Sequence, residues 1–210
     1  MTTQGKRTKI EDIRRVELIA AAHRVFLEHG LKGMTSARIC REAGMSPGIL
    51  AYYFKGKDEV LFGMVRYNNR LLMEDIIARM RTAQTSWARL EAIVEGNFPA
   101  AAFTRTIANA WLSVCSEAGS NPQYARLQRL FHQRLRSNLA SVFGAMFDAA
   151  QLREASIIIA TLVDGLWLRK AVADDIGRDE AVSLVFRGIR SLITADEEER
   201  LRRERPQQYK

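Results

Sequence analysis

The stretch TSARICREAGMSPGILAYYFKGK, residues 35–57, decides the fold of the N-terminal part of this chain. Thr35 or Ser36 is expected to cap a short helix that Gly44 ends. Ser46 is expected to cap a second short helix, because hydroxyl side chains accept from the free N–H groups of a first helical turn. The stretch therefore predicts two short helices joined by a tight turn that contains glycine.

Longer helices are predicted on both sides of this pair. Apolar residues recur every three or four positions over 13–29, and Gly30 follows. Asp58 is expected to cap a helix that continues beyond twenty residues. Ile49 and Phe54 should hold the second short helix to this scaffold, so the arrangement predicts a helix-turn-helix DNA-binding domain over 1–57.

The charge distribution supports a polyanionic partner for this domain. Residues 1–57 contain 11 Lys and Arg against 5 Asp and Glu, whereas the other 153 residues contain 21 against 19. Lys6, Arg7 and Lys9 are expected to form a flexible basic arm that reaches a DNA groove or backbone. A solvated basic surface is the alternative interpretation of the charge alone.

The motif from Thr35 to Leu61 resembles the DNA-binding domain of the TetR family of repressors. The resemblance implies phosphate contacts at the helix ends and base contacts from the second short helix. Ala51 and Tyr52 stand where many members carry an aromatic residue and a histidine, which affects the operator that is read. The expected DNA-binding residues are Thr35, Ser36, Ser46, Pro47, Gly48, Ile49, Tyr52, Tyr53, Lys55 and Lys57.

The remaining sequence predicts helices throughout, and therefore an all-α protein. A regulatory domain is expected over 58–195 and a polar tail that frays into disorder over 196–210. The helices predicted after the long one cover 87–95, 103–118, 122–149, 154–173 and 179–194.

The last two of these helices predict a homodimer interface. They offer more apolar surface than one small domain readily covers, and in the TetR family the corresponding pair resembles a dimerising bundle. A two-fold dimer implies a palindromic operator. An intramolecular core is the alternative. The apolar residues concerned are Ile157, Ile158, Ile159, Leu162, Val163, Val182, Val185, Phe186, Ile189 and Leu192.

A carboxylate among aromatic residues predicts the effector site. Asp164 lies in an apolar helix one turn before Trp167, and a buried carboxylate needs a partner such as Arg169 or a cationic ligand. Trp111 and Phe98 offer further rings, and aromatic faces attract quaternary ammonium groups. A core aspartate with a protein partner and ordinary aromatic packing is the alternative.

Motifs across the regulatory part resemble the choline-responsive BetI group. They are GNF (96–98), AWL (110–112), YARLQ (124–128), RLRSNL (134–139) and LVDGLWLR (162–169). The resemblance implies choline or another small amine as effector, with Phe98, Trp111, Asp164 and Trp167 as ligand contacts. A polyamine or a neutral aromatic metabolite also suits aromatics around an acid.

Other function classes lack their signatures. His23, His29 and His132 are scattered, and we expect no catalytic residue, metal site or cofactor. Cys40 and Cys115 do not form a disulfide framework, and the longest apolar run is too short to cross a bilayer. The expectation is a cytoplasmic regulator that binds double-stranded DNA and a small effector, with no enzyme activity and no membrane partner.

Overall fold

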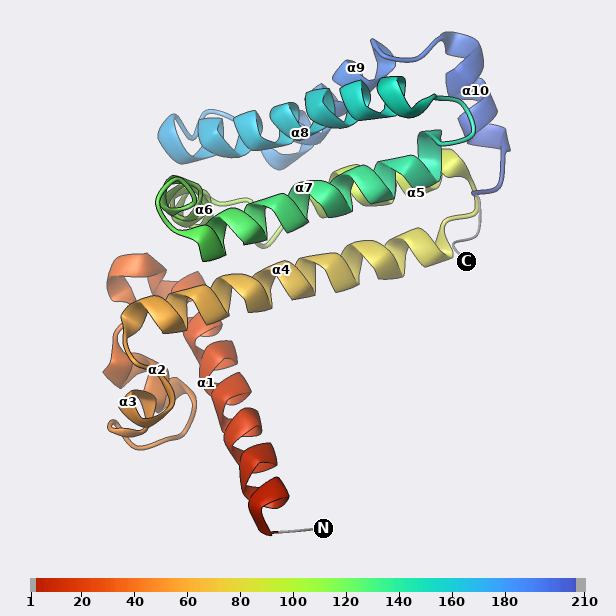
Figure 1. Cartoon of the computed structure of the whole chain (residues 1–210). Helices are drawn as coiled ribbons and strands as arrows, with labels where there is room; N and C mark the ends of the chain where they lie inside the picture. The colour runs from red at the N-terminus through yellow and green to blue at the C-terminus, as the bar shows by residue number, and fades with distance from the viewer. Residues whose placement is uncertain (1–2, 207–210) are drawn as a thin grey trace. The chain divides into compact units, whose positions relative to one another are not determined.

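The computed structural model describes residues 3–206, apart from the side chains of residues 3–10, 31, 32 and 57. Within these residues every regular element is a helix, which confirms the all-α prediction (Figure 1). The chain divides into two compact units, Met1–Leu71 and Leu72–Lys210. We call them the N-terminal unit and the C-terminal unit and describe each by itself.

The N-terminal unit is built on α1 (Thr3–Gly33), against which α2 (Ser36–Glu42) and α3 (Ile49–Tyr53) pack. Gly30 interrupts α1 with a φ of 66°, as predicted for the end of the first helix. Residues 6–9 were expected to be a flexible arm, but their backbone is helical. Neither glycine nor proline separates them from the apolar part of α1, so the helix extends to them.

The first half of α4 (Lys57–Thr82) belongs to the N-terminal unit. A Cβ added at Gly63 would lie 2.7 Å from the Ile19 side chain, so α4 and α1 approach closely there. His23 also hydrogen-bonds Asn68 at 3.0 Å. The N-terminal unit thus extends to Leu71, whereas the DNA-binding domain was predicted to end at residue 57. Asp58 lies in the first turn of α4 and is not its cap, because the helix already begins at Lys57.

The central helix of the C-terminal unit is α8 (Ala149–Val172). It contacts α6 (Arg105–Glu117), α7 (Pro122–Phe143) and α9 (Arg178–Arg190), while α5 (Ser86–Gly96) packs against α7 and α9 (Figure 1). Helix α7 ends six residues earlier than predicted. Asp148 then caps α8, and its side chain and that of Gln151 bond each other's backbone N–H groups.

The apolar residues of α8 and α9 divide between the core and the surface. Ile159, Val163, Val185 and Ile189 are buried in the core of the C-terminal unit, and Ile157 is exposed. These four buried residues therefore belong to an intramolecular core and not to a dimer interface, because they lie on the inward faces of two adjacent helices.

The segment predicted to be a disordered tail begins with a helix, α10 (Ala195–Arg203). Leu201 is 1% exposed and lies in the core, where α10 packs against α5. The Arg202 guanidinium lies 4.1 Å from the centre of the Trp87 ring, and the Ser86 N–H donates to the Glu204 carbonyl at 2.9 Å. The prediction was wrong because one inward leucine and one stacked arginine suffice to dock an otherwise charged helix. Residues 207–210 lie outside the described residues.

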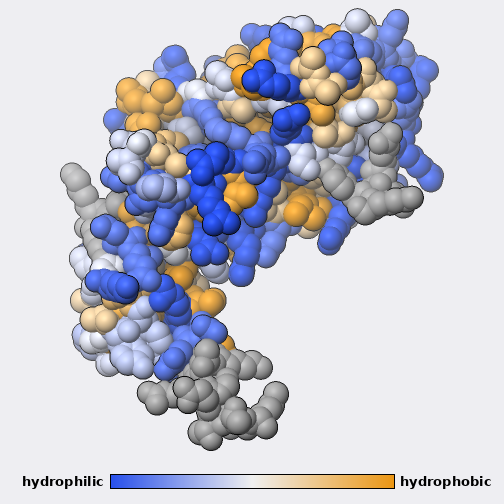
Figure 2. All heavy atoms as spheres, in the orientation of Figure 1, coloured by the Kyte–Doolittle hydropathy of each residue, from blue (hydrophilic) through white to orange (hydrophobic). Residues whose placement is uncertain are grey.

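Hydrophilic side chains cover most of the face shown in Figure 2, and hydrophobic ones interrupt it in small patches. Among the described residues, no helix has both the length and the apolar character that crossing a membrane requires.

Candidate functional site

Glycine builds the turn between α2 and α3. Gly44 has a φ of +65°, a conformation that residues with a Cβ rarely adopt. Its N–H donates to the Arg41 carbonyl at 3.1 Å, and the Met45 N–H donates to the Cys40 carbonyl at 2.8 Å. These bonds satisfy the last carbonyls of α2. The buried Cys40 thiol donates to the Pro47 carbonyl at 3.5 Å and ties α2 to the segment that begins the second helix.

The caps of these two helices differ from each other. The Thr35 hydroxyl accepts the Arg38 N–H at 3.3 Å, which confirms Thr35 as a cap. Helix α3 begins only at Ile49, whose N–H donates to the Ser46 backbone carbonyl at 3.1 Å. Gly48 is its N-cap residue. Ser46 therefore contributes its backbone carbonyl to a tight turn that precedes the helix. Its side chain does not cap the helix.

The underside of α3 is anchored by two buried residues. Phe54 is buried as predicted, but Leu50 is the second anchor and Ile49 is only half-buried. Neighbouring positions of an α-helix are turned about 100° from each other, so Ile49 and Leu50 cannot both face the scaffold fully.

Most residues predicted to bind DNA are exposed. They lie at the start of α2, in the turn before α3, on α3 and in the segment after it. Ile49 and Tyr53 are half-buried, and the side chain of Lys57 lies outside the described residues. The exposed ones are Thr35, Ser36, Ser46, Pro47, Gly48, Tyr52 and Lys55.

Arg15 on α1 clamps the end of α3, a role that the sequence analysis missed. Its guanidinium donates to the Tyr53 carbonyl at 2.6 Å, lies 4.5 Å from the centre of the Phe54 ring and forms an ion pair with Glu59. The Glu59 carboxylate also accepts the Lys55 N–H at 2.8 Å. That backbone N–H first, and Arg15 second, hold the pKa of Glu59 below its ordinary value.

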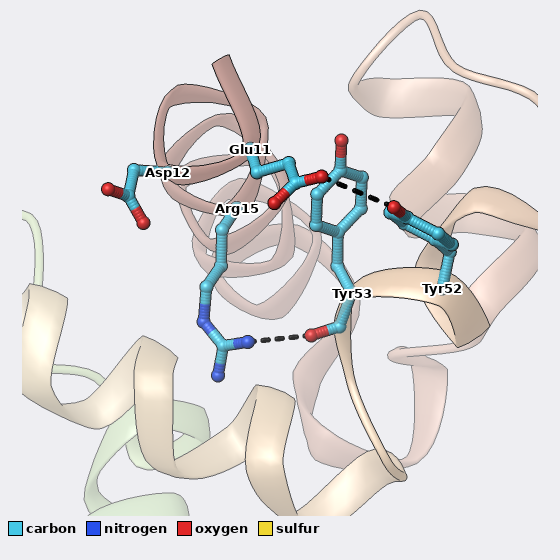
Figure 3. A pocket seen from close by; sticks show the side chains of 5 residues that line it. All are labelled: Glu11, Asp12, Arg15, Tyr52 and Tyr53. Atoms are coloured by element: carbon cyan, nitrogen blue, oxygen red, sulfur yellow. Dashed lines mark hydrogen bonds between the residues drawn. The ribbon is translucent and has the colours of Figure 1, made fainter. Parts of the chain in front are cut away.

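A cavity of about 270 Å³ lies beside this clamp (Figure 3). It is lined by Glu11, Asp12 and Arg15 from α1 and by Tyr52 and Tyr53 from α3. The Tyr52 hydroxyl donates to Glu11 Oε1 at 3.3 Å. Glu11 thus lies next to the exposed face of α3, and Asp12 adds a second carboxylate to the lining, within a segment that is otherwise rich in basic residues.

Asp164 in the C-terminal unit is half-buried and has a protein partner. Its Oδ2 lies 3.0 Å from His132 Nε2, a residue of α7. Arg169, which the sequence analysis considered as that partner, pairs with Asp175 instead. The hydrogen bond to Asp164 is the largest effect on the pKa of His132, which is raised above its ordinary value despite partial burial.

The surroundings of Asp164 extend to α6. Burial, and secondly the Asp164 charge, raise the pKa of the Cys115 thiol to about 12. The Cys115 sulfur accepts a hydrogen bond from Gln128 Nε2 at 2.9 Å. Cys115 lies one turn after Trp111, so this face of α6 is directed at the face of α8 that carries Asp164.

Four aromatic rings form a cluster around Trp167, which lies three residues after Asp164 on α8. Trp167 lies 5.0 Å from Phe103, 6.3 Å from Trp111 and 6.4 Å from Phe98, measured between ring centres. Trp111 and Trp167 are half-buried, whereas Phe98 is fully buried and offers no surface to a ligand. The structure thus brings the predicted ligand residues together, and Phe98 supports Trp167 from beneath.

Hydrogen bonds to the backbone fix the Asn97–Phe98 turn under this cluster. Trp167 Nε1 donates to the Asn97 carbonyl at 3.0 Å, and Arg178 Nε donates to the Phe98 carbonyl at 2.8 Å. The buried Asn97 side chain donates to the Ile93 carbonyl at 2.7 Å. Trp167 is therefore held by its ring contacts and at its polar edge.

Two family models match the chain. Residues 18–64 match the bacterial regulatory proteins of the tetR family, and residues 87–194 match the C-terminal domain of BetI-type transcriptional repressors. The second match covers α5 to α9 and ends before α10.

Curated relatives extend this similarity over most of the chain. The HTH-type transcriptional regulator BetI of Cronobacter sakazakii is 40% identical over 78% of this chain and 82% of its own length. The BetI regulator of Burkholderia mallei is 37% identical over 79% and 86%. These relatives are transcriptional regulators.

Solved structures share the fold at low identity. A TetR transcription regulator from Haloarcula marismortui has a TM-score of 0.74 at 20% identity, covering 87% of this chain and all of its own. A transcriptional regulator from Saccharomonospora viridis, solved in complex with choline, has a TM-score of 0.69 at 22% identity. It covers 83% of this chain and 94% of its own.

Proposed function

This chain belongs to the TetR family and is a transcriptional repressor of the BetI type, and from that premise we propose that choline or a similar small cation controls it. The protein binds a palindromic operator in cytoplasmic DNA as a homodimer, and the cation releases it. The observation that carries the proposal is the half-buried Asp164 carboxylate one helical turn before Trp167, whose ring centre lies 6.3 Å from that of Trp111.

This arrangement suits a quaternary ammonium ion. Each aromatic face contributes about 0.5–2 kcal/mol to the binding of such a cation, and the carboxylate neutralises its charge. The regulator from Saccharomonospora viridis, which has the same fold, binds choline and supports this effector class. In this chain His132 is hydrogen-bonded to the Asp164 carboxylate, so an entering cation replaces His132 as the partner of Asp164.

Apolar residues on the outside of α8 support the homodimer. Ile157, Leu168 and Val172 are exposed there. A Cβ added at Gly188 would lie 2.4 Å from the Leu162 side chain, so α8 and α9 pack closely enough to act as one surface. Two copies related by a two-fold axis place their α3 helices about 34–36 Å apart, one turn of DNA.

The two functions are coupled through α4, the helix that both units share. The cation favours a conformation of the C-terminal unit in which α4 holds α3 away from the operator spacing. Coupling of this kind weakens DNA binding by about 5- to 150-fold.

The test is operator release by choline, compared with release by 3,3-dimethylbutanol, which has the same shape without the charge. Choline should lower operator affinity in a fluorescence anisotropy titration, and the neutral compound should not. Asp164→Asn should still bind the operator but lose the response, because the neutral amide no longer attracts the cation.

Asp175→Asn is the matched control, since it removes an exposed carboxylate near the end of α8 and should leave the response intact. An undiminished response to choline in Asp164→Asn would contradict the proposed site. Release by a polyamine or a neutral aromatic metabolite, with none by choline, would replace the proposed effector class.

A further inference from the structure

The contact between Glu11 and Tyr52 lies on the side of α3 that is proposed to face DNA. Tyr52 is 64% exposed, yet its hydroxyl is directed at the Glu11 carboxylate, 3.3 Å away (Figure 3). The Tyr53 ring meets the Tyr52 ring edge to face at 5.0 Å between centres. The exposed Tyr52 side chain is thus held at its hydroxyl and at its ring.

The neighbouring cation, Arg15, has its own partners at the end of α3. The guanidinium of Arg15, which lines the same cavity, donates to the Tyr53 carbonyl and pairs with Glu59. These interactions direct Arg15 toward the end of α3, and the Glu11 carboxylate accepts a hydrogen bond from the Tyr52 hydroxyl.

The direction of this hydrogen bond determines what Tyr52 can recognise. A carboxylate only accepts hydrogen bonds, so the single proton of the Tyr52 hydroxyl is directed at Glu11. The lone pairs of the hydroxyl oxygen then remain for another molecule. In the major groove the groups that donate to such an acceptor are the amino groups of adenine and cytosine.

We propose that Glu11 is a positioning residue for operator specificity, which makes Tyr52 a hydrogen-bond acceptor that selects adenine or cytosine at the position it reads. This inference rests on the proposed binding of Tyr52 to base edges. Without Glu11 the hydroxyl would donate as readily as accept, and guanine and thymine, which present acceptors, would be tolerated as well.

Electrostatics give Glu11 a separate effect that has to be distinguished from this one. Glu11 and Asp12 are adjacent carboxylates in the same cavity, and both repel DNA phosphates. Removing either charge should strengthen binding to DNA of any sequence. Of these two carboxylates, Glu11 is the one that accepts the hydrogen bond from the Tyr52 hydroxyl in the contacts described above, so only its removal should alter base preference.

The experiment selects bound duplexes from a random pool and then measures affinities for operators that differ at one base pair. Glu11→Ala should reduce the preference for adenine or cytosine at one position per half-site by about three- to tenfold. Asp12→Ala should keep the native preference. In a Tyr52→Phe background, Glu11→Ala should change no preference, because Glu11 acts through the hydroxyl.

A native preference retained in Glu11→Ala would overturn the inference while leaving the proposed function intact. The same change of preference with Tyr52→Phe present would overturn it too, since Glu11 would then act by another route. If the native protein enriched no sequence at all, the proposed function and this inference would both fall.

Discussion

The N-terminal and C-terminal units hold their functional side chains in different ways. In the N-terminal unit most residues proposed to meet DNA are exposed, and the polar clamp around Arg15 fixes the end of α3. In the C-terminal unit the rings around Trp167 pack on one another, and His132 hydrogen-bonds the carboxylate of Asp164. The proposed DNA-reading surface is thus formed in advance, whereas the proposed effector site has an internal partner that a ligand would have to displace.

The largest effect is expected from a substitution in the apolar core of the C-terminal unit. Leu201→Ala should lower the free energy of unfolding by about 2–5 kcal/mol, because it leaves a cavity where α10 enters the core. Urea denaturation measures this change. Glu199→Ala, on the exposed side of α10, is the control and should stay within about 0.5 kcal/mol of the native protein. Equal stability of the two variants would show that α10 is not docked.

The polar clamp gives the next largest effect. Arg15→Ala removes the bond to the Tyr53 carbonyl and the ion pair with Glu59, so α3 should lose its fixed position. Operator affinity should fall by about tenfold, corresponding to one charge-assisted hydrogen bond. Arg14→Ala removes an exposed arginine paired with Glu17 and serves as the control for charge. Equal losses in the two variants would reduce Arg15 to a general electrostatic role.

The smallest expected effect is the pH dependence of choline affinity, which tests the role of His132. Its pKa is raised by Asp164, so the protonated pair stabilises the folded chain at low pH, and this contribution is lost as the pH rises through the raised pKa. Choline must displace that pair, and calorimetry should show its affinity increasing over the same pH range, by a few-fold and at most about tenfold per pH unit.

His132→Gln removes the titrating group and should flatten this pH profile. Choline affinity that did not vary with pH in the native protein, or that varied equally in the variant, would contradict competition between His132 and the cation.

Local signals in the sequence predicted the DNA-binding unit well. The Thr35 cap, the break at Gly30 and the turn at Gly44 each depend on residues within a few positions of one another. The family resemblance was confirmed over both units.

Long-range pairs could not be found in this way. Arg15 and Tyr53 are 38 residues apart, and His132 and Asp164 are 32 apart. A single arginine or histidine on the polar face of a helix resembles a solvated residue until the packing of the helices brings its partner close. Leu201 was overlooked for a related reason, because one aliphatic residue among charges gives little periodicity.

The environment of Cys115 has a consequence for chemical labelling. The chain has two cysteines, one in each unit: Cys40 is fully buried, and the pKa of Cys115 is raised to about 12. Because the thiolate is the reactive form, both native thiols are poor nucleophiles at neutral pH. A cysteine introduced on an exposed helix face would therefore react first. The native sequence is thus already a suitable background for attaching one probe to each unit and following α4 while an effector binds.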